Sequence, residues 1–189
     1  MLLLTLACTV PSDQGARPMV DGPGFFDRPF PADSRTFQGH PDFTGFPGQG
    51  EIALLDDYIA VADEVQGFGT NSPLFVRFEE AIDTAQLPTP QQSRAVKKST
   101  VLLVDVDPRS PYQGEPVPLA FQWTADATTF QPSNLLAITP VPGFPLRPAT
   151  TYALVLKEPL ARKGSQELDW EADKALTSVE ATLRSLEVD

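Results

Sequence analysis

Cysteine and histidine each occur only once in the 189 residues, as Cys8 and His40. A single cysteine excludes a disulfide within the chain, so the cysteine count says nothing about the redox compartment. A zinc site takes three or four histidine, cysteine or carboxylate ligands, and the sequence offers too few of the first two. His40 stands between Gly39 and Pro41, where the simplest interpretation is a loop residue, because a base or metal ligand would lack partners there.

Motifs that carry catalysis are missing as well. The sequence contains no Gly-x-Ser-x-Gly, which an α/β-hydrolase nucleophile needs, and no Gly-x-x-x-x-Gly-Lys phosphate-binding loop. A Ser-His-Asp triad could use only His40, and no serine stands in the context of a nucleophile. The sequence therefore predicts no catalytic residue, no cofactor and no metal ligand, and it leaves open whether the protein is an enzyme.

Three carboxylates near strand ends leave one alternative open. Asp105 and Asp107, with Asp126 elsewhere, could contribute oxygen atoms to a calcium site. The more ordinary interpretation of Asp-x-Asp at the end of a strand is a solvated pair that caps a turn.

Basic residues are few relative to acidic ones. Lysine and arginine number 14 against 25 aspartates and glutamates, which gives a formal net charge of −11. Such a charge repels nucleic acid and anionic lipid headgroups, so nucleic acid is not an expected partner.

Proline and phenylalanine, by contrast, are plentiful, with 20 and 12 residues. The share of proline is about twice the usual level of about 5%. Together with clear apolar runs, this composition predicts a mainly β fold with connections stiffened by proline.

The first eight residues, Met-Leu-Leu-Leu-Thr-Leu-Ala-Cys, form a short apolar run that ends in a small residue and a cysteine. This run resembles the end of a bacterial lipoprotein signal peptide. The resemblance implies a lipid anchor at Cys8, a membrane as partner, and a location at the bacterial outer membrane or cell surface. A cleaved secretory signal without lipid, giving a secreted protein, and an incidental apolar start are the alternatives. The run is too short to span a membrane, which takes about 20 apolar residues.

Two further regions precede the predicted strands. Residues 9–24 are polar and rich in proline and glycine, which predicts a flexible tether. Residues 25–66 predict an irregular aromatic segment followed by a helix. Six phenylalanines stand among prolines and glycines, at positions 25, 26, 30, 37, 43 and 46. We expect their rings to cover an edge or end of a β-sandwich, and an exposed aromatic groove for a ligand is the alternative. Helical spacing of apolar residues from 51 to 65 predicts an amphipathic helix packed on the sandwich.

Short apolar runs in residues 67–168 predict the strands of an Ig-like antiparallel β-sandwich. The runs cover residues 74–78, 100–106, 117–123, 135–139 and 151–156, and a proline-rich turn joins the last two. An uninterrupted apolar stretch at 101–104 predicts a strand that is buried on both faces or lies under a covering segment. The run 117–123 alternates, and Pro118 places it at an edge or a bulge. Apolar residues three or four apart in 169–189 predict a C-terminal amphipathic helix, which we expect to lead into a further region downstream.

Three motifs follow one another along the chain: Phe-Pro-Ala-Asp at 30–33, Gly-Phe-Gly-Thr-Asn-Ser-Pro at 67–73, and Pro-Leu-Arg-Pro-Ala-Thr-Thr-Tyr at 145–152. Their order resembles the N-terminal region of large secreted bacterial lipoproteins, including the N-terminal domain of bacterial virulence-factor lipases. The strand pattern resembles the Ig-like domains of bacterial surface-layer proteins. The resemblance implies that a catalytic part, where there is one, follows this region, so no catalytic residue is carried over to this chain.

The sequence thus favours a non-enzymatic Ig-like module of a membrane-anchored bacterial lipoprotein that acts as a spacer or interaction domain. The first alternative is the N-terminal, non-catalytic part of a secreted lipase or esterase whose catalytic domain lies downstream. The second is a surface domain that binds calcium or glycans.

Overall fold

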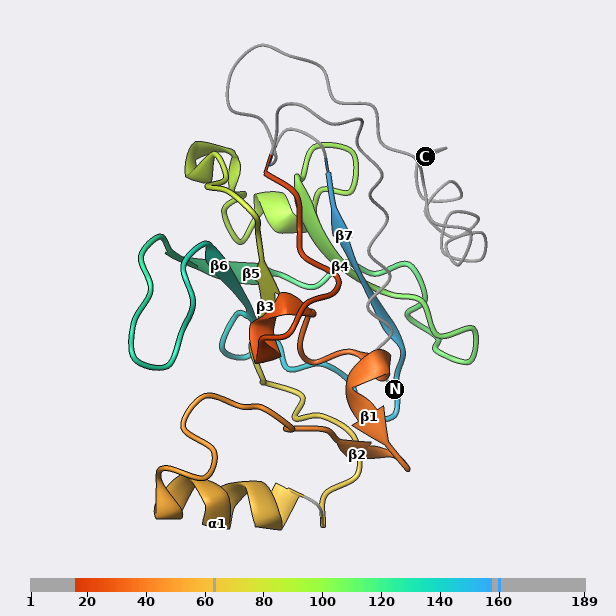
Figure 1. Cartoon of the computed structure of the whole chain (residues 1–189). Helices are drawn as coiled ribbons and strands as arrows, with labels where there is room; N and C mark the ends of the chain where they lie inside the picture. The colour runs from red at the N-terminus through yellow and green to blue at the C-terminus, as the bar shows by residue number, and fades with distance from the viewer. Residues whose placement is uncertain (1–15, 63, 158–159, 161–189) are drawn as a thin grey trace.

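The computed structural model describes residues 16–62, 64–157 and 160. In this part of the chain, seven strands form three small antiparallel sheets, and one α-helix accompanies them (Figure 1). The fold is therefore mainly β, as the sequence predicts. The predicted signal segment 1–8, with Cys8, and the predicted amphipathic segment 169–189 lie outside the described residues.

Two of the sheets contain the five strands that the apolar runs predict. The larger sheet has the order β3-β6-β5, with bounds Leu74–Arg77, Leu135–Pro140 and Leu119–Thr124. The smaller sheet pairs β4 (Val101–Asp105) with β7 (Tyr152–Leu156). All pairings are antiparallel.

Residues from both of these sheets build one apolar core. Alternate residues of each strand contribute to it, because successive side chains point to opposite faces of a strand. The contributing strand residues are Leu74, Val76, Val101, Leu103, Leu119, Leu136, Ile138, Tyr152, Leu154 and Leu156. Every residue of β4 is buried, which confirms the prediction that residues 101–104 are covered on both faces.

Strand β5 lies at an edge of its sheet, as Pro118 predicts. Among the described strands it pairs only with β6, and Pro118 precedes its first residue. Its alternation is also as predicted: Phe121 and Trp123 pack against the core, whereas Ala120 and Gln122 are exposed.

The proline-rich connection between β6 and β7 carries the chain from one sheet to the other. Among the described residues β6 pairs with β3 and β5, and β7 pairs with β4. The backbone N–H of Leu146, inside this connection, donates to the carbonyl of Thr70 at 2.9 Å. The connection is therefore a corner between sheets and not the tight turn of a hairpin.

Residues 16–19, which the sequence places in a flexible tether, lie along β3 instead. Pro18 forms an antiparallel bridge with Phe78, and the N–H of Met19 donates to the carbonyl of Arg77 at 2.7 Å. Ala16 is buried in the core. Backbone hydrogen bonds to a strand edge require no apolar pattern, so the composition of this segment gave no sign of them.

The third sheet is a hairpin of β1 (Thr36–Phe37) and β2 (His40–Pro41), and α1 (Ala53–Ala62) lies below it in Figure 1. The prediction that the helix packs on the sandwich is wrong in this respect: none of the residues of α1 is buried. Ile59 faces the β1–β2 region, while Leu54, Tyr58 and Val61 are exposed.

Candidate functional site

Five of the six N-terminal phenylalanines gather into one aromatic cluster. Phe25, Phe26 and Phe30 are buried there together with Leu135 of β6, and the rings of Phe43, Phe46, Phe68 and Phe75 pack against them. Five of the six rings therefore cover one part of the larger sheet, which confirms that this segment lays its rings on a sheet. The exception is Phe37, which is 71% exposed.

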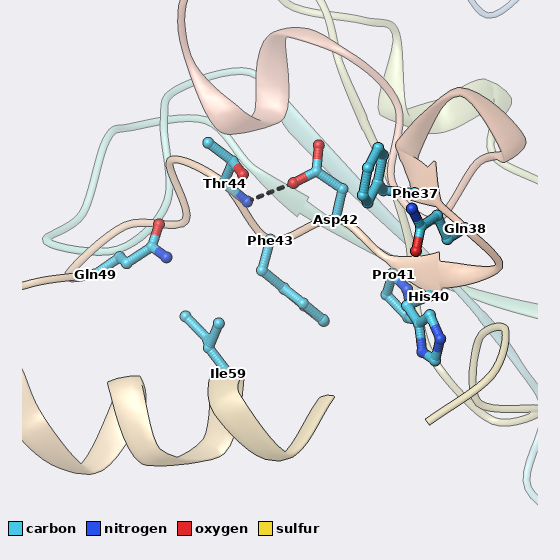
Figure 2. Close-up of a pocket in the computed structure, with 9 residues that line it drawn as sticks. All are labelled: Phe37, Gln38, His40, Pro41, Asp42, Phe43, Thr44, Gln49 and Ile59. Atoms are coloured by element: carbon cyan, nitrogen blue, oxygen red, sulfur yellow. Dashed lines mark hydrogen bonds between the residues drawn. The ribbon is translucent and has the colours of Figure 1, made fainter. Parts of the chain in front are cut away.

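An open pocket of about 610 Å³ lies beside this cluster, between the hairpin and α1 (Figure 2). Its lining consists of Phe37, Gln38, His40, Pro41, Asp42, Phe43, Thr44, Gln49 and Ile59. We take this pocket as the candidate binding site because it brings aromatic, amide, hydroxyl and charged side chains to one surface.

The turn between β1 and β2 sets the shape of the pocket rim. Gln38 and Gly39 both have positive φ angles, of 52° and 88°, as a two-residue type I′ turn requires. Glycine adopts this conformation without steric cost, and nothing lies within 4 Å of a Cβ added at Gly39. The turn fixes Phe37 and His40 opposite each other in the hairpin.

His40 ties the hairpin to the segment that follows α1. It is the first residue of β2 rather than a loop residue, directly after the turn. Its Nδ1 lies 3.0 Å from the carbonyl oxygen of Val65, and the N–H of Gly67 donates to the carbonyl of Gly39 at 2.9 Å. One ring nitrogen is thus engaged in holding the backbone together.

Asp42 is the charged residue of the pocket. Its carboxylate accepts a hydrogen bond from the N–H of Thr44 at 2.9 Å, drawn as a dashed line in Figure 2. The hydrogen bonds from Thr44 lower the pKa of Asp42, and the positive charges of Arg35 and Arg28 lower it further. Asp42 is therefore ionised at neutral pH.

The lining residues suit recognition better than catalysis. They include neither serine nor cysteine, and the histidine uses Nδ1 in a structural contact. The exposed ring of Phe37 offers an apolar face, while Thr44 and Gln49 offer hydrogen bonds. The pocket therefore offers groups that can hold a ligand, with the hydroxyl of Thr44 already hydrogen-bonded to the carboxylate of Asp42.

The carboxylates that could have formed a calcium site are used elsewhere. Asp105 accepts from the N–H of Asp107 at 3.0 Å and from the hydroxyl of Ser110 at 2.6 Å. Asp107 binds Arg109, and the hydrogen bonds from Arg109 lower the pKa of Asp107 to about 2. The pair caps a turn, as the more ordinary interpretation says, but both residues are buried and not solvated.

Asp126 is exposed in the loop after β5. In residues 16–62, 64–157 and 160, no group of three or more histidines, cysteines or acidic residues could hold a metal ion. Cys8, the predicted lipidation site, lies outside the described residues.

The three motifs noted in the sequence meet around one small cavity. Its lining takes Pro31 from the first motif, Phe68, Gly69, Thr70 and Ser72 from the second, and Leu146, Arg147, Pro148, Ala149, Thr150 and Tyr152 from the third. In the third motif the hydroxyl of Tyr152 accepts a hydrogen bond from the N–H of Arg147 at 2.9 Å. These contacts give the motifs a structural role at the corner between the sheets.

No family model, no curated protein and no solved structure matches this chain. Of the helices that the structure describes, none has the length and apolar character that crossing a bilayer requires.

Proposed function

We propose that this chain is a non-enzymatic Ig-like module of a membrane-anchored bacterial lipoprotein, and that it acts as a spacer or interaction domain. The observation that carries the proposal is how the strands, taken in sequence order, are divided between the sheet β3-β6-β5 and the sheet β4-β7. An Ig-like domain has strands A, B, E and D in one sheet and C, F and G in the other.

The described strands follow that scheme in sequence order. β3, β4, β5, β6 and β7 take the places of strands B, C, D, E and F, because β3-β6-β5 is one sheet and β4-β7 the other. In this proposal, residues 16–19, which pair with the end of β3 on the edge that does not face β6, correspond to strand A. Five strands in this alternating order support an Ig-like sandwich over other β folds with two sheets.

A second observation supports the same fold. Tyr152 is the first residue of β7, in the place of strand F, and its hydroxyl hydrogen bonds to the backbone of Arg147, five residues earlier. Ig-like sandwiches use a tyrosine in this place and in this manner at the corner between strands E and F.

The proposed role follows from this architecture. Side chains of both sheets interdigitate in one core, which gives a stiff body suited to holding another part of a protein away from a membrane. The pocket beside the hairpin, lined by the exposed Phe37 and the partly buried Asp42, offers a contact surface.

A second candidate is the non-catalytic front part of a secreted lipase or esterase. The meeting of all three motifs around one cavity favours it, because those motifs are the ones that resemble the N-terminal domain of virulence-factor lipases. Sequencing the gene beyond the codon for Asp189 separates the two candidates. A Gly-x-Ser-x-Gly in a strand-to-helix context there would favour the lipase, and its absence would favour the module.

The lipid anchor is tested by intact mass and membrane partition of the protein made in a bacterium from its upstream codons. The native protein, Cys8→Ser and the control Ser12→Ala are compared. We expect the added mass of a diacylglycerol and a membrane fraction for the native protein and the control, and neither for Cys8→Ser. A soluble product without lipid in all three would contradict the proposal of an anchor.

A further inference from the structure

Arg35 is a buried charge with an unpaired edge. It is 1% exposed, and its guanidinium carbon lies 4.2 Å from the centroid of the Phe25 ring and 5.9 Å from that of Phe30. Its Nε and Nη2 are buried and have no hydrogen-bond partner among the residues that the structure describes. The aromatic faces stabilise the positive charge, but they accept no hydrogen bond in the plane of the guanidinium.

The two unpaired atoms belong to the same side of the guanidinium group. Nε–H and Nη2–H point in parallel from one edge, and this spacing matches the two oxygens of a carboxylate. A buried donor without an acceptor is unfavourable, and a buried charge more so. Burial indeed lowers the pKa of Arg35, and the charge of Arg28 lowers it further. The two donors of this edge are therefore left without an acceptor among the described residues.

Three other arginines of the described part pair with carboxylates. Arg77 pairs with Asp27, Arg109 with Asp107, and Arg147 with Asp105 and Glu115. The Nε of Arg28 is also buried without a hydrogen-bond partner among the described residues. The positive charge of Arg28 lowers the pKa of both Arg35 and Asp42, so the three side chains interact electrostatically. The carboxylate of Asp33, two residues before Arg35, does not fill this edge, because its Oδ2 is likewise buried without a hydrogen-bond partner among the described residues.

The open pocket begins next to these arginines. Asp42, in the pocket lining, donates its backbone N–H to the carbonyl of Arg35 at 2.8 Å. The ring of Phe43, also in the lining, stacks parallel to the ring of Phe25, on which Arg35 lies. The pocket wall is thus shared with the residues that surround Arg35.

We propose that the Nε–Nη2 edge of Arg35, assisted by Nε of Arg28, receives a carboxylate group, supplied either by a free organic acid or by an acidic side chain of a polypeptide. A planar carboxylate can accept one hydrogen bond from Nε–H and one from Nη2–H in parallel. A spherical anion such as chloride cannot accept from both donors in this parallel geometry. The inference goes beyond the proposed function, because the site would exist whether or not Cys8 carries a lipid.

The test uses the full chain and two probes, sodium acetate for a free acid and hexaglutamate for a polypeptide carboxylate. After long incubation, the midpoint of thermal unfolding is measured against each probe, with sodium chloride keeping the ionic strength constant. A ligand that binds only the folded state raises this midpoint in a saturable way. The variants are Arg35→Lys, which keeps the charge without the edge, and the control Arg109→Lys, on the exposed surface.

We expect a saturable rise for at least one probe, unchanged in Arg109→Lys and requiring about tenfold more probe in Arg35→Lys. A response to acetate assigns the site to free acids, and a response to hexaglutamate alone assigns it to polypeptides. The ¹⁵N spectrum of the native protein adds a readout that needs no variant, because the Nε–H resonance of Arg35 shifts downfield when it donates to a carboxylate.

Three results would overturn the proposal. One is the absence of any response to both probes, and another is an equal response when chloride replaces the probe. The third is a response that Arg35→Lys leaves undiminished while the Nε–H resonance of Arg35 stays in place.

Discussion

The hydroxyl of Tyr152 accepts a hydrogen bond from the backbone N–H of Arg147 at 2.9 Å, and the tyrosine is 1% exposed. This bond joins the first residue of β7 to the connection that arrives from β6. The side chain of Arg147 then reaches outward, where it pairs with Glu115 and lies 3.7 Å from the centroid of the Tyr112 ring. The corner between the two sheets is therefore stabilised by the buried hydroxyl of Tyr152 and by the partly exposed side chain of Arg147.

Tyr152→Phe removes the acceptor from this corner and leaves a backbone N–H without its partner. We expect a loss of about 1–3 kcal/mol in the free energy of unfolding, measured by urea denaturation. Tyr112→Phe is the matched control, because Tyr112 is 45% exposed and its ring face remains available to Arg147. Equal stability of the two variants would show that the hydrogen bond of Tyr152 does not hold the corner.

Buried and exposed phenylalanines of the N-terminal segment should contribute differently to the free energy of unfolding. Phe25→Ala removes a ring that is 5% exposed and that contacts Phe26, Phe30 and Phe46, so we expect a loss of about 3–5 kcal/mol. Phe37→Ala changes a ring that is 71% exposed, and its effect should stay within about 0.5 kcal/mol. Denaturation curves that show a small effect for Phe25→Ala would mean that the segment does not cover the sheet.

Asp27 connects the N-terminal segment to β3. Its carboxylate pairs with Arg77 and accepts the N–H of Gly24 at 2.7 Å, and its side chain is 6% exposed. Asp27→Asn leaves Arg77 without its charged partner. We expect a loss of about 2 kcal/mol, less than for a fully buried pair because the side chain of Arg77 is 28% exposed.

A double-mutant cycle tests this pair. The double variant Asp27→Asn/Arg77→Met should be less destabilised than the sum of the two single variants, because each single change already breaks the same ion pair. Asp57→Asn, on the exposed side of α1, serves as the control and should change little. Additive effects in the cycle would contradict a direct link between the two side chains.

Acid should weaken the turn after β4 through Asp107. Hydrogen bonds from Arg109 lower the pKa of Asp107 to about 2, from 3.8. Since the folded-state pKa is the lower one, the contribution of Asp107 is present above the unfolded value and is lost as the pH falls through about 2. Asp107→Asn should therefore flatten the fall in the thermal midpoint between pH 4 and pH 2. Asp126→Asn, in an exposed loop, should follow the native curve, and a native-like curve for Asp107→Asn would contradict the assignment.

The strands could be predicted because their signals are local. The uninterrupted apolar run at 101–104 and the alternation from Leu119 to Trp123 each report burial through the side chains of the strand itself. Pro118 likewise marked an edge, because proline cannot donate a hydrogen bond to a further strand.

The features that the sequence did not predict depend on distant partners. Residues 16–19 pair with β3 through backbone atoms, which leave no pattern in the side chains. Nothing local distinguishes the buried Arg35 from a surface arginine, because its burial comes from rings up to ten residues away in the chain. The apolar spacing of α1 indicated a helix but not which surface it faces, and most of that apolar side is exposed.

The most direct test of the Ig-like strand order is a measurement of strand pairing in solution by NMR. In antiparallel sheets the Hα atoms of residues in non-hydrogen-bonded pairs lie close together. The account predicts Hα–Hα cross-peaks between Leu103 and Leu154 and between Phe75 and Ala137, which place β7 beside β4 and β6 beside β3. Cross-peaks that instead pair β6 with β7 as a hairpin would contradict the alternation between two sheets on which the proposed function rests.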